Sequence, residues 1–599
     1  MDFSTLDMTI PSIHTAYREG SLTPDELVDH LLNRCDDYLD HAIWIRQLSK
    51  QEIQPYLERL VTSSIEDLPL YGIPFAIKDN IDLAGVPTTA ACVEFSYDPA
   101  EHAHVVAELI NAGAIPIGKT NLDQFATGLV GVRSPEPWGP CKNSINPDYI
   151  SGGSSAGSAV AVALGLVTFS LGTDTAGSGR VPAAFNNIVG LKPSKGLLST
   201  QGVVPACRSL DCVSIFSLTT DDANSVFDVA AHFDSADIYA RANIDTNKAN
   251  YGQLTHASFR FATPTVKQLN FFGNDEAKLG FEQTVKTLES LGGIHQTIDF
   301  EPFLAAARLL YEGPWVAERR VATSGVKHEH MLPVIQNILA SQVDATADDL
   351  FTAQYKLQAC YQQVKPVLAD YDFILTPTTG TIYTREEVLA DPIQLNSNLG
   401  YYTNFMNLLD CSAIAVPAGF ASNGLPYGVT LFSRAFSDSR LMSYGNALQQ
   451  ALNIALGSTT HPLPKTTAKQ AGVSDRIELL VCGAHLEGLP LNWQLTDRGG
   501  KLVKKTTTSE NYRLYALAGG PPERPGIVRD ETLGTSIEVE VWSLPTAQLG
   551  SFVANIPAPL GIGKVELADG SWLTGFICEP YGIDTATDIT HKGGWRAHI

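Results

Sequence analysis

Apolar runs of strand length alternate with segments of helical spacing up to about residue 455, and the pattern then changes. Residues 23–40, for example, begin with Thr-Pro-Asp-Glu, a helix start, and continue with helical apolar spacing. This alternation predicts an α/β domain over residues 1–455, with helices over a sheet. The polar, proline-bearing segment 456–475 predicts a linker, and residues 476–599 predict a smaller, strand-rich α+β domain.

The chain is strongly acidic, with a formal net charge of −23 over 599 residues, and its densest basic cluster is Lys501 to Lys505. We interpret that cluster as a solvated strand edge, so we expect neither nucleic acid nor a membrane as a partner. The nine cysteines are scattered without CxxC spacing, which is typical of a reducing compartment. The N-terminal residues lack the basic and apolar regions of a signal peptide, so we expect a cytoplasmic protein.

A loop rich in glycine, threonine and serine, SLGTDTAGSGRVP at residues 170–182, is a candidate for nucleophilic catalysis. Its glycines would let successive backbone N–H groups point at one oxyanion, although a tight turn that caps a helix is the commoner use of such a loop. The candidate donors are the N–H groups of Thr175, Ala176, Gly177 and Ser178. If Ser178 reacts, its proton needs an acceptor, and no histidine lies between His104 and His232.

Two upstream features are candidates for that proton transfer. Lys78 lies in the apolar run YGIPFAIKDNI, residues 71–81, which predicts a buried strand. A lysine there either reaches the surface along its aliphatic stem or is buried with a lowered pKa, so that the neutral amine acts as a base. A second glycine–serine loop, residues 151–159, enters a predicted helix, and chemistry alone does not separate its adjacent serines, Ser154 and Ser155.

These features, in this order, resemble the amidase signature family over roughly residues 20–450. The resemblance rests on Lys78, GGSSAGS at 152–158, GTDTAGSGRVP at 172–182 and GLKPSKG at 190–196. It implies that Ser178 is the nucleophile, that Ser154 is a bridging serine after a cis peptide bond to Gly153, and that Lys78 is the base. It also implies that the sheet is mixed and covered by helices, and that the enzyme needs no cofactor and no metal ion.

Other patterns in this part of the chain are interpreted as structural. GAIPIGKT, residues 113–120, satisfies the GxxxxGK[ST] phosphate-loop pattern, but Ile-Pro-Ile fills the part that should form a flexible backbone nest. The histidines of HEHM, residues 328–331, are too close in sequence for the helical metal pair of zinc proteases. We expect Asp174 and Arg180 to fix the loop around Ser178 through charge-assisted hydrogen bonds.

The block RLLYEGPWVAERR, residues 308–320, resembles the allophanate hydrolases of this family. The resemblance implies that Tyr311 and Arg319 bind the carboxylate of allophanate, which is urea carboxylated on nitrogen. A guanidinium pairs both oxygens of a carboxylate, although a surface salt bridge is the commoner role of any one arginine. Arg320 is an adjacent competitor that the sequence does not exclude.

The C-terminal part, with VCGAHLEGLPLNWQL at 481–495 and the terminal GGWRAHI, resembles the C-terminal domain of allophanate hydrolases. This domain is also similar to the γ-glutamylcyclotransferase fold, but SFVANIPAPLG at 551–561 lacks an acid, which makes cyclotransferase activity doubtful. The resemblance implies that the amidase step gives ammonia and N-carboxycarbamate, which this domain helps to decarboxylate, for two ammonia and two carbon dioxide overall. His485 is either the group that manages the proton or a structural core histidine. Residues that could line its pocket are Asn492, Gln494 and Arg529.

Two alternatives stay open at this point. One is another small-substrate amidase with an architectural C-terminal domain, and the other is an amidotransferase A-type subunit that works around transfer RNA. The acidic charge weighs against the second alternative. The family resemblance also implies a homodimer. A urea carboxylase that acts in the same pathway is expected to be a separate chain or to be lacking.

Overall fold

The structure is a computed structural model that describes residues 3, 6–244, 247, 251–252, 258–465 and 476–599. The chain divides into two compact units, Met1–Thr466 and Thr467–Ile599. Leu456 and Leu463 are buried in the core of the first unit, which therefore continues past residue 455. The rest of the predicted linker, residues 466–475, lies outside the described residues.

Across the described residues of the first unit, eleven strands form one mixed sheet in the order β1-β3-β2-β4-β6-β5-β10-β11-β9-β7-β8. These strands are β1 (Trp44–Gln47), β2 (Pro74–Lys78), β3 (Ile115–Thr120), β4 (Phe169–Asp174), β5 (Val189–Lys192), β6 (Cys212–Ser217), β7 (Phe259–Pro264), β8 (Gly293–Ile298), β9 (Phe373–Pro377), β10 (Cys411–Phe420) and β11 (Pro426–Arg434). β2 runs parallel to both β3 and β4, whereas β4 to β11 in the sheet order are antiparallel neighbours. The predicted fold class is confirmed.

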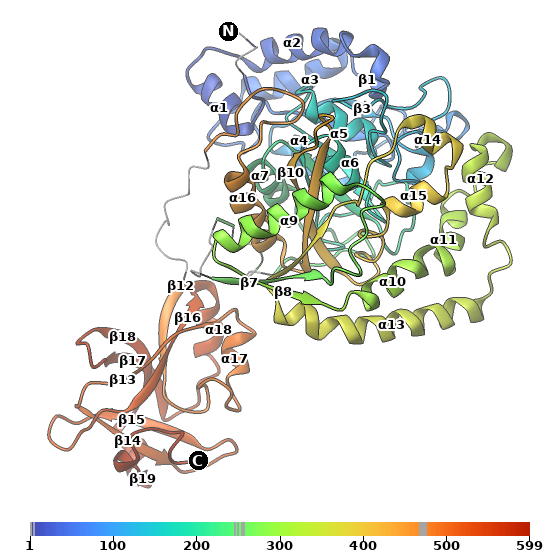
Figure 1. Ribbon diagram of the computed structural model, residues 1–599. Helices are drawn as coiled ribbons and strands as arrows, with labels where there is room; N and C mark the ends of the chain where they lie inside the picture. The colour runs from blue at the N-terminus through green and yellow to red at the C-terminus, as the bar shows by residue number, and fades with distance from the viewer. Residues whose placement is uncertain (1–2, 4–5, 245–246, 248–250, 253–257, 466–475) are drawn as a thin grey trace. The chain divides into compact units, whose positions relative to one another are not determined.

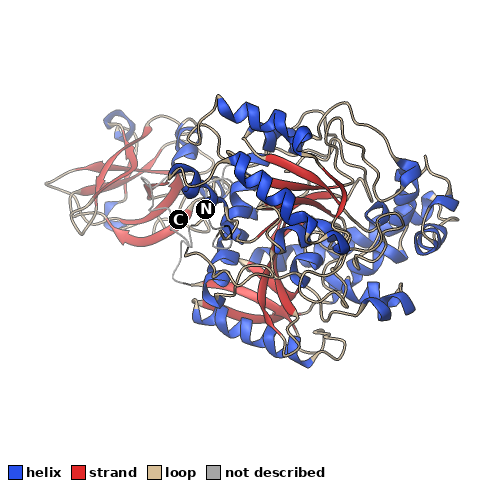
Figure 2. Ribbon diagram, turned by 90° about the horizontal axis from the view of Figure 1, so that it is seen from above, coloured by secondary structure: helices blue, strands red, loops and turns tan. Residues whose placement is uncertain are grey.

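Helices lie on both sides of this sheet (Figures 1 and 2). They are α1 (Ile10–Arg18), α2 (Pro24–Asp36), α3 (Lys50–Val61), α4 (His104–Asn111), α5 (Ala156–Ala163), α6 (Val181–Phe185), α7 (Thr220–Ala230), α9 (Asp275–Ser290), α10 (Glu301–Glu312), α11 (Trp315–Ala322), α12 (Pro333–Ala340), α13 (Ala347–Asp370), α14 (Arg385–Ala390), α15 (Gln394–Leu399) and α16 (Asp438–Leu452). Short 3₁₀ turns include η4 (Gln124–Ala126) and η5 (His328–His330). In the described part of the chain, no helix combines the length and apolar character needed to cross a membrane.

Local sequence signals explain several of these elements. Thr23 caps α2, because its hydroxyl accepts the N–H of Glu26 while the Glu26 carboxylate accepts the N–H of Thr23. α5 consists mainly of alanine, glycine, serine and valine and is buried along its whole length, and its small side chains allow it to pack on β2 and β4. α4 ends before Gly113, whose φ of +98° turns the chain into β3.

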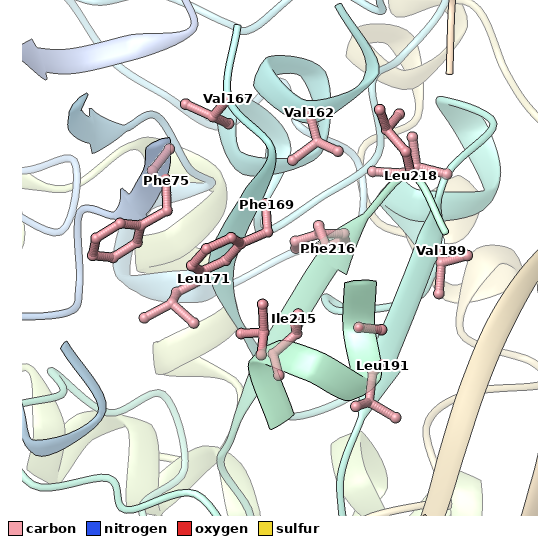
Figure 3. Packing of buried hydrophobic residues seen from close by; sticks show 14 of the residues in the cluster. Phe75, Val162, Val167, Phe169, Leu171, Val189, Leu191, Ile215, Phe216 and Leu218 are labelled. Atoms are coloured by element: carbon pink, nitrogen blue, oxygen red, sulfur yellow. The ribbon is translucent and has the colours of Figure 1, made fainter. Parts of the chain in front are cut away.

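Aromatic packing sets the register of β2 and β4 (Figure 3). Phe75 of β2 and Phe169 of β4 are register partners, and their stacked ring centroids lie 5.1 Å apart. Both side chains are fully buried, as is Leu171, so a shift by one residue would move apolar groups out of the core. This register brings the last residue of β2, Lys78, beside the end of β4, where the loop containing Ser178 begins.

The second unit is built from strands around a core of its own. Its described residues form a five-stranded sheet, β13-β16-β12-β18-β17, and a three-stranded sheet, β15-β14-β19. The elements are β12 (Arg476–Val481), α17 (Trp493–Thr496), β13 (Lys501–Thr507), β14 (Tyr512–Leu517), β15 (Arg524–Arg529), β16 (Glu538–Pro545), α18 (Thr546–Val553), β17 (Leu560–Glu566), β18 (Trp572–Cys578) and β19 (Thr587–Asp588). The basic cluster Lys501 to Lys505 lies on β13 at the edge of its sheet, as predicted.

Candidate active site

Lys78 ends β2 with its side chain fully buried. Its Nζ lies 2.8 Å from the hydroxyl oxygen of Ser154 and 2.7 Å from that of Thr173. Burial lowers the pKa of Lys78 to about 7, although neighbouring carboxylates act in the opposite direction. Near neutral pH, much of this amine is therefore uncharged and able to accept a proton from Ser154.

The two adjacent serines in the loop before α5 have different hydrogen-bond partners. The peptide bond between Gly153 and Ser154 is cis, as the family resemblance implied. Ser154 directs its hydroxyl at Lys78, whereas the hydroxyl of Ser155 accepts the N–H of Thr173 at 3.3 Å and donates to the carbonyl of that residue at 3.2 Å. Ser154 is therefore placed for proton transfer, and Ser155 fastens the loop to β4.

The loop containing Ser178 connects β4 to α6 and is fixed by buried contacts. Arg180 donates from Nε and Nη2 to the two carboxylate oxygens of Asp174 at 2.8 and 2.9 Å, and the N–H of Gly179 donates to the same carboxylate at 3.0 Å. Burial alone would raise the pKa of Asp174, but Arg180 outweighs this effect and lowers it. The predicted supporting roles of Asp174 and Arg180 are confirmed, and Ser178 is held between rigid neighbours.

Four consecutive backbone N–H groups in this loop, those of residues 175–178, are buried, and none donates a hydrogen bond to the described part of the chain. Buried N–H groups without an acceptor are rare in folded proteins, so these groups are candidate donors to a substrate oxygen. Gly177 is required here, because its φ is +141° and a Cβ would lie 2.5 Å from the Thr403 hydroxyl. The Ser178 hydroxyl makes only a long contact, 3.4 Å, with the carbonyl of Gly128.

Arg319 and Arg320 are adjacent residues of α11, but their side chains have different hydrogen-bond partners. Arg319 is only 3% exposed, donates from Nη1 to the Thr127 hydroxyl at 2.9 Å and lies 5.9 Å from the Tyr311 ring centroid. It forms no ion pair with a carboxylate among the described residues. Arg320 donates instead to the carbonyl of Gln342, after α12. Of the two, Arg319 is the buried cation without a direct ion pair among the described residues, and Tyr311 lies beside it.

Sequence reasoning missed three polar groups around the site. Thr173, within the GTDT motif, contacts the amine of Lys78 directly. Asp211 accepts the hydroxyl of Thr175, and burial raises the pKa of this carboxyl group to about 6. Arg133 is buried beside Gly128. The position of Thr173 within the GTDT motif could have identified it from the sequence, whereas no local sequence pattern marks Asp211 or Arg133.

The two patterns interpreted as structural carry no site. The lysine of GAIPIGKT, Lys119, is fully buried within β3, forms an ion pair with Asp79 at 3.1 Å and donates to the Thr88 hydroxyl. The segment that a phosphate loop would need is thus a strand. HEHM falls on the 3₁₀ turn η5, and the described residues contain no group of three or more histidine, cysteine or acidic side chains that could hold a metal ion.

In the second unit, His485 lines a cavity of about 310 Å³. Its Nε2 lies 3.0 Å from the amide oxygen of Gln494, and its ring stacks on Phe576 with centroids 5.1 Å apart. Burial lowers the pKa of His485, which is therefore neutral at pH 7. Other lining residues include Cys482, Gly483, Ala484, Arg524 and Pro557.

The three residues expected around His485 have different positions. Gln494 lines the cavity, as expected. Asn492 lies outside the lining and donates from its side chain to the carbonyl of His485 at 2.9 Å, so it orients the backbone. Arg529 also lies outside the lining, because Glu566 and Glu531 hold its guanidinium. The expectation for Arg529 was wrong, since its position on β15 directs it to acidic neighbours.

Comparisons with known proteins cover both units. Residues 26–442 match the amidase family, and residues 477–599 match the allophanate hydrolase C-terminal domain. The chain is 43% identical to the urea amidolyase of Saccharomyces cerevisiae over 582 residues, which cover 94% of this chain and 31% of that protein. It therefore spans about a third of the length of the urea amidolyases that it matches.

A solved structure also matches both units. The allophanate hydrolase of Kluyveromyces lactis superimposes with a TM-score of 0.75 at 40% identity, covering 99% of each chain. Among sequence relatives, the A-type polypeptide of the glutamyl-tRNA(Gln) amidotransferase of Halothermothrix orenii is 30% identical, and its match covers 75% of this chain and 98% of that polypeptide. The matches to the urea amidolyase and to the allophanate hydrolase thus extend over the second unit.

Proposed function

The chain belongs to the amidase family, and from that premise we propose that it is an allophanate hydrolase that cleaves the terminal amide of allophanate at Ser178. The observation that supports this substrate is the buried guanidinium of Arg319, which forms no ion pair with a carboxylate of the described residues and is attracted to Asp211 and Glu318 only through space. A buried charge without a partner is costly, so the site favours a ligand that brings a carboxylate. Tyr311, beside this guanidinium, completes the anion subsite.

The proton path follows the contacts around Lys78. Neutral Lys78 takes the proton of Ser154, and Ser154 takes the proton of Ser178, whose oxygen attacks the terminal carbonyl of allophanate. The resulting oxyanion accepts hydrogen bonds from the N–H groups of residues 175–178. When the tetrahedral intermediate collapses, the leaving nitrogen receives a proton back through Ser154 and departs as ammonia. Water then attacks the acyl-enzyme along the same path and releases N-carboxycarbamate.

The oxyanion donors and the base contribute to the rate of the chemical step, whereas Arg319 contributes to substrate binding. Each preorganised oxyanion donor contributes about 10²–10³ in kcat in comparable sites, and a positioned base contributes about 10²–10⁴. Arg319 acts on binding and orientation, because the carboxylate that it holds is not the group that reacts. A bidentate guanidinium also fixes the direction of the substrate, so that the amide end faces Ser178.

We further propose that the second unit promotes loss of carbon dioxide from N-carboxycarbamate. The C–N bond to one carboxylate breaks, carbon dioxide leaves, and the nitrogen takes up one proton to give carbamate, which decomposes to ammonia and carbon dioxide. Water supplies that proton, and His485, neutral in a cavity of about 310 Å³, relays it to the nitrogen. The side chain of Gln494 fixes the imidazole ring through Nε2.

The alternatives are less well supported. The A-type amidotransferase polypeptide of Halothermothrix orenii matches over 75% of this chain, whereas the K. lactis allophanate hydrolase matches over 99% of it, the second unit included. An amidase for neutral amides would have no use for a buried guanidinium that lacks a direct ion pair. Because allophanate is carboxylated urea, we propose that a urea-carboxylating enzyme supplies the substrate. The expected homodimer and cytoplasmic location stay predictions.

The test is ammonia release from freshly prepared allophanate, compared with biuret, in which a neutral amide replaces the carboxylate. We expect turnover of allophanate, turnover of biuret at least 100-fold lower in kcat/KM, and loss of both in Ser178→Ala. Equal turnover of the two compounds would overturn the substrate but leave the amidase chemistry standing. For the second unit, His485→Ala should leave the first ammonia unchanged and slow carbon dioxide release, and unchanged carbon dioxide kinetics would remove its proposed role.

A further inference from the structure

A second buried arginine near Ser178 has hydrogen-bonding capacity that the protein leaves unused. Arg133 is 3% exposed, and its guanidinium donates to two carbonyls, that of Thr127 from Nη1 at 3.0 Å and that of Pro392 from Nη2 at 2.6 Å. Its Nε is buried and has no partner among the described residues. A guanidinium has five N–H donors, so most of this cation's capacity is unused.

The neighbouring carboxylate, Asp123, does not neutralise Arg133 by direct pairing. One oxygen of Asp123 accepts the backbone N–H groups of Val130 and Gly131 at 3.2 and 3.1 Å, and the other accepts the N–H of Arg133 at 2.8 Å. The guanidinium of Arg133 forms no ion pair with it or with another carboxylate in the described part of the chain. The two charges attract each other only through space.

Arg133 lies against the residues that contact the nucleophile. Thr127 joins the two buried arginines, since its carbonyl accepts from Arg133 and its hydroxyl accepts from Arg319. A Cβ built on the next residue, Gly128, would lie 3.1 Å from Nη1 of Arg133, and the carbonyl of Gly128 lies 3.4 Å from the Ser178 hydroxyl. Two buried guanidinium groups without direct ion pairs among the described residues thus share Thr127, and the carbonyl of the next residue contacts Ser178.

We propose that Arg133 is a second anion-binding residue of the amidase site, which holds the substrate carboxylate together with Arg319. The identity of that substrate rests on the proposed function. Two buried cations on either side of Thr127 repel each other, and a carboxylate relieves this repulsion because its two oxygens have lone pairs for both guanidinium groups. Hydrolysis also adds a second negative charge, in N-carboxycarbamate, which two cations accommodate better than one. A neutral amide supplies neither charge.

The competing role for Arg133 is purely structural, because it ties the segment after η4 to the carbonyl of Pro392. The two roles differ in their kinetic signature. Loss of a structural tie lowers the fraction of active protein, and therefore the apparent kcat, while the KM of the remaining active molecules is unchanged. Loss of an anion-binding group raises the KM for allophanate and weakens binding of anions at the site.

The experiment measures steady-state kinetics with allophanate and calorimetric binding of malonate, a dianion in which CH₂ replaces the NH of N-carboxycarbamate. The variants are Arg133→Gln and Arg133→Lys, and the matched control is Arg320→Gln, which removes a positive charge from the same unit outside the site. We expect Arg133→Gln to raise KM and the malonate Kd at least tenfold, Arg133→Lys to raise both by less, and Arg320→Gln to change neither by more than twofold.

An unchanged KM and malonate Kd in Arg133→Lys and Arg133→Gln, with or without a lower kcat, would overturn the proposal. If Arg133→Gln does not fold, Arg133→Lys decides the matter alone, because it keeps the charge but loses the fork geometry. A wild-type protein that binds malonate but leaves allophanate intact would overturn the proposed substrate only, and the malonate Kd values would still test Arg133. A wild-type protein that does not bind malonate would overturn the anion site itself.

Discussion

The acid limb of the pH–rate profile tests the role of Lys78. Burial lowers its pKa from 10.5 to about 7, a difference of roughly 5 kcal/mol between the charged and neutral forms. The neutral fraction then falls from about 0.9 at pH 8 to about 0.1 at pH 6, because a single proton binds with a midpoint near 7. If the neutral amine is the base, kcat/KM for allophanate should fall about tenfold over these two pH units.

The assay is initial ammonia release at constant ionic strength, corrected at each pH for the spontaneous decomposition of allophanate. The carboxyl group of Asp211, with a pKa of about 6, would give a second acid limb, and its negative charge also raises the pKa of Lys78. Asp211→Asn should therefore keep a single acid limb, with its midpoint moved to lower pH. The variant His485→Ala, in the second unit, should show the same acid limb of the pH–rate profile when release of the first ammonia is measured.

Two results would refute this reasoning about Lys78. One is a kcat/KM that is constant from pH 6 to pH 8, since the base would then be a different group. The other is a kcat/KM that still rises tenfold per pH unit above pH 8.5, since the lysine would then have its ordinary pKa and burial would not have changed it.

The other predictions concern individual side chains of the same site. Ser154→Ala should lower kcat for allophanate about 10²–10⁴-fold by breaking the proton path, whereas Ser155→Ala should mainly lower the melting temperature, and equal kcat values in the two variants would contradict their assignment. Thr173→Val removes an oxygen that stabilises the ammonium form of the lysine base, so the acid limb of the pH–rate profile should move to lower pH, and a shift to higher pH would have the wrong sign. Arg319→Lys should raise KM for allophanate at least tenfold with a smaller change in kcat, while Arg320→Lys should change neither, and the reverse order would exchange their roles.

The sequence by itself determined the elements and the chemical groups of this protein. Alternating apolar runs identified the α/β part, and the change of pattern after residue 455 indicated a second, strand-rich unit. The glycine-rich loop around Ser178 and the lysine within an apolar run were candidates for catalysis, and the resemblance to the amidase family assigned them as nucleophile and base. These features depend on neighbours in the chain, through side-chain period, backbone freedom of glycine and burial of a strand, so they are visible locally.

The family resemblance selected Ser154 and Arg319, and only the tertiary structure gave the physical reason that separates each from the adjacent residue of the same type. Ser154 differs from Ser155, and Arg319 from Arg320, in which partner each one reaches, and those partners are distant in sequence. Arg133 had no local signal at all, because its interpretation depends on an Nε without a partner among the described residues and on the position of its guanidinium beside Gly128. The register of β2 and β4 and the packing of α11 fix the distances between these side chains and their partners. Both depend on contacts between side chains that are far apart in the sequence.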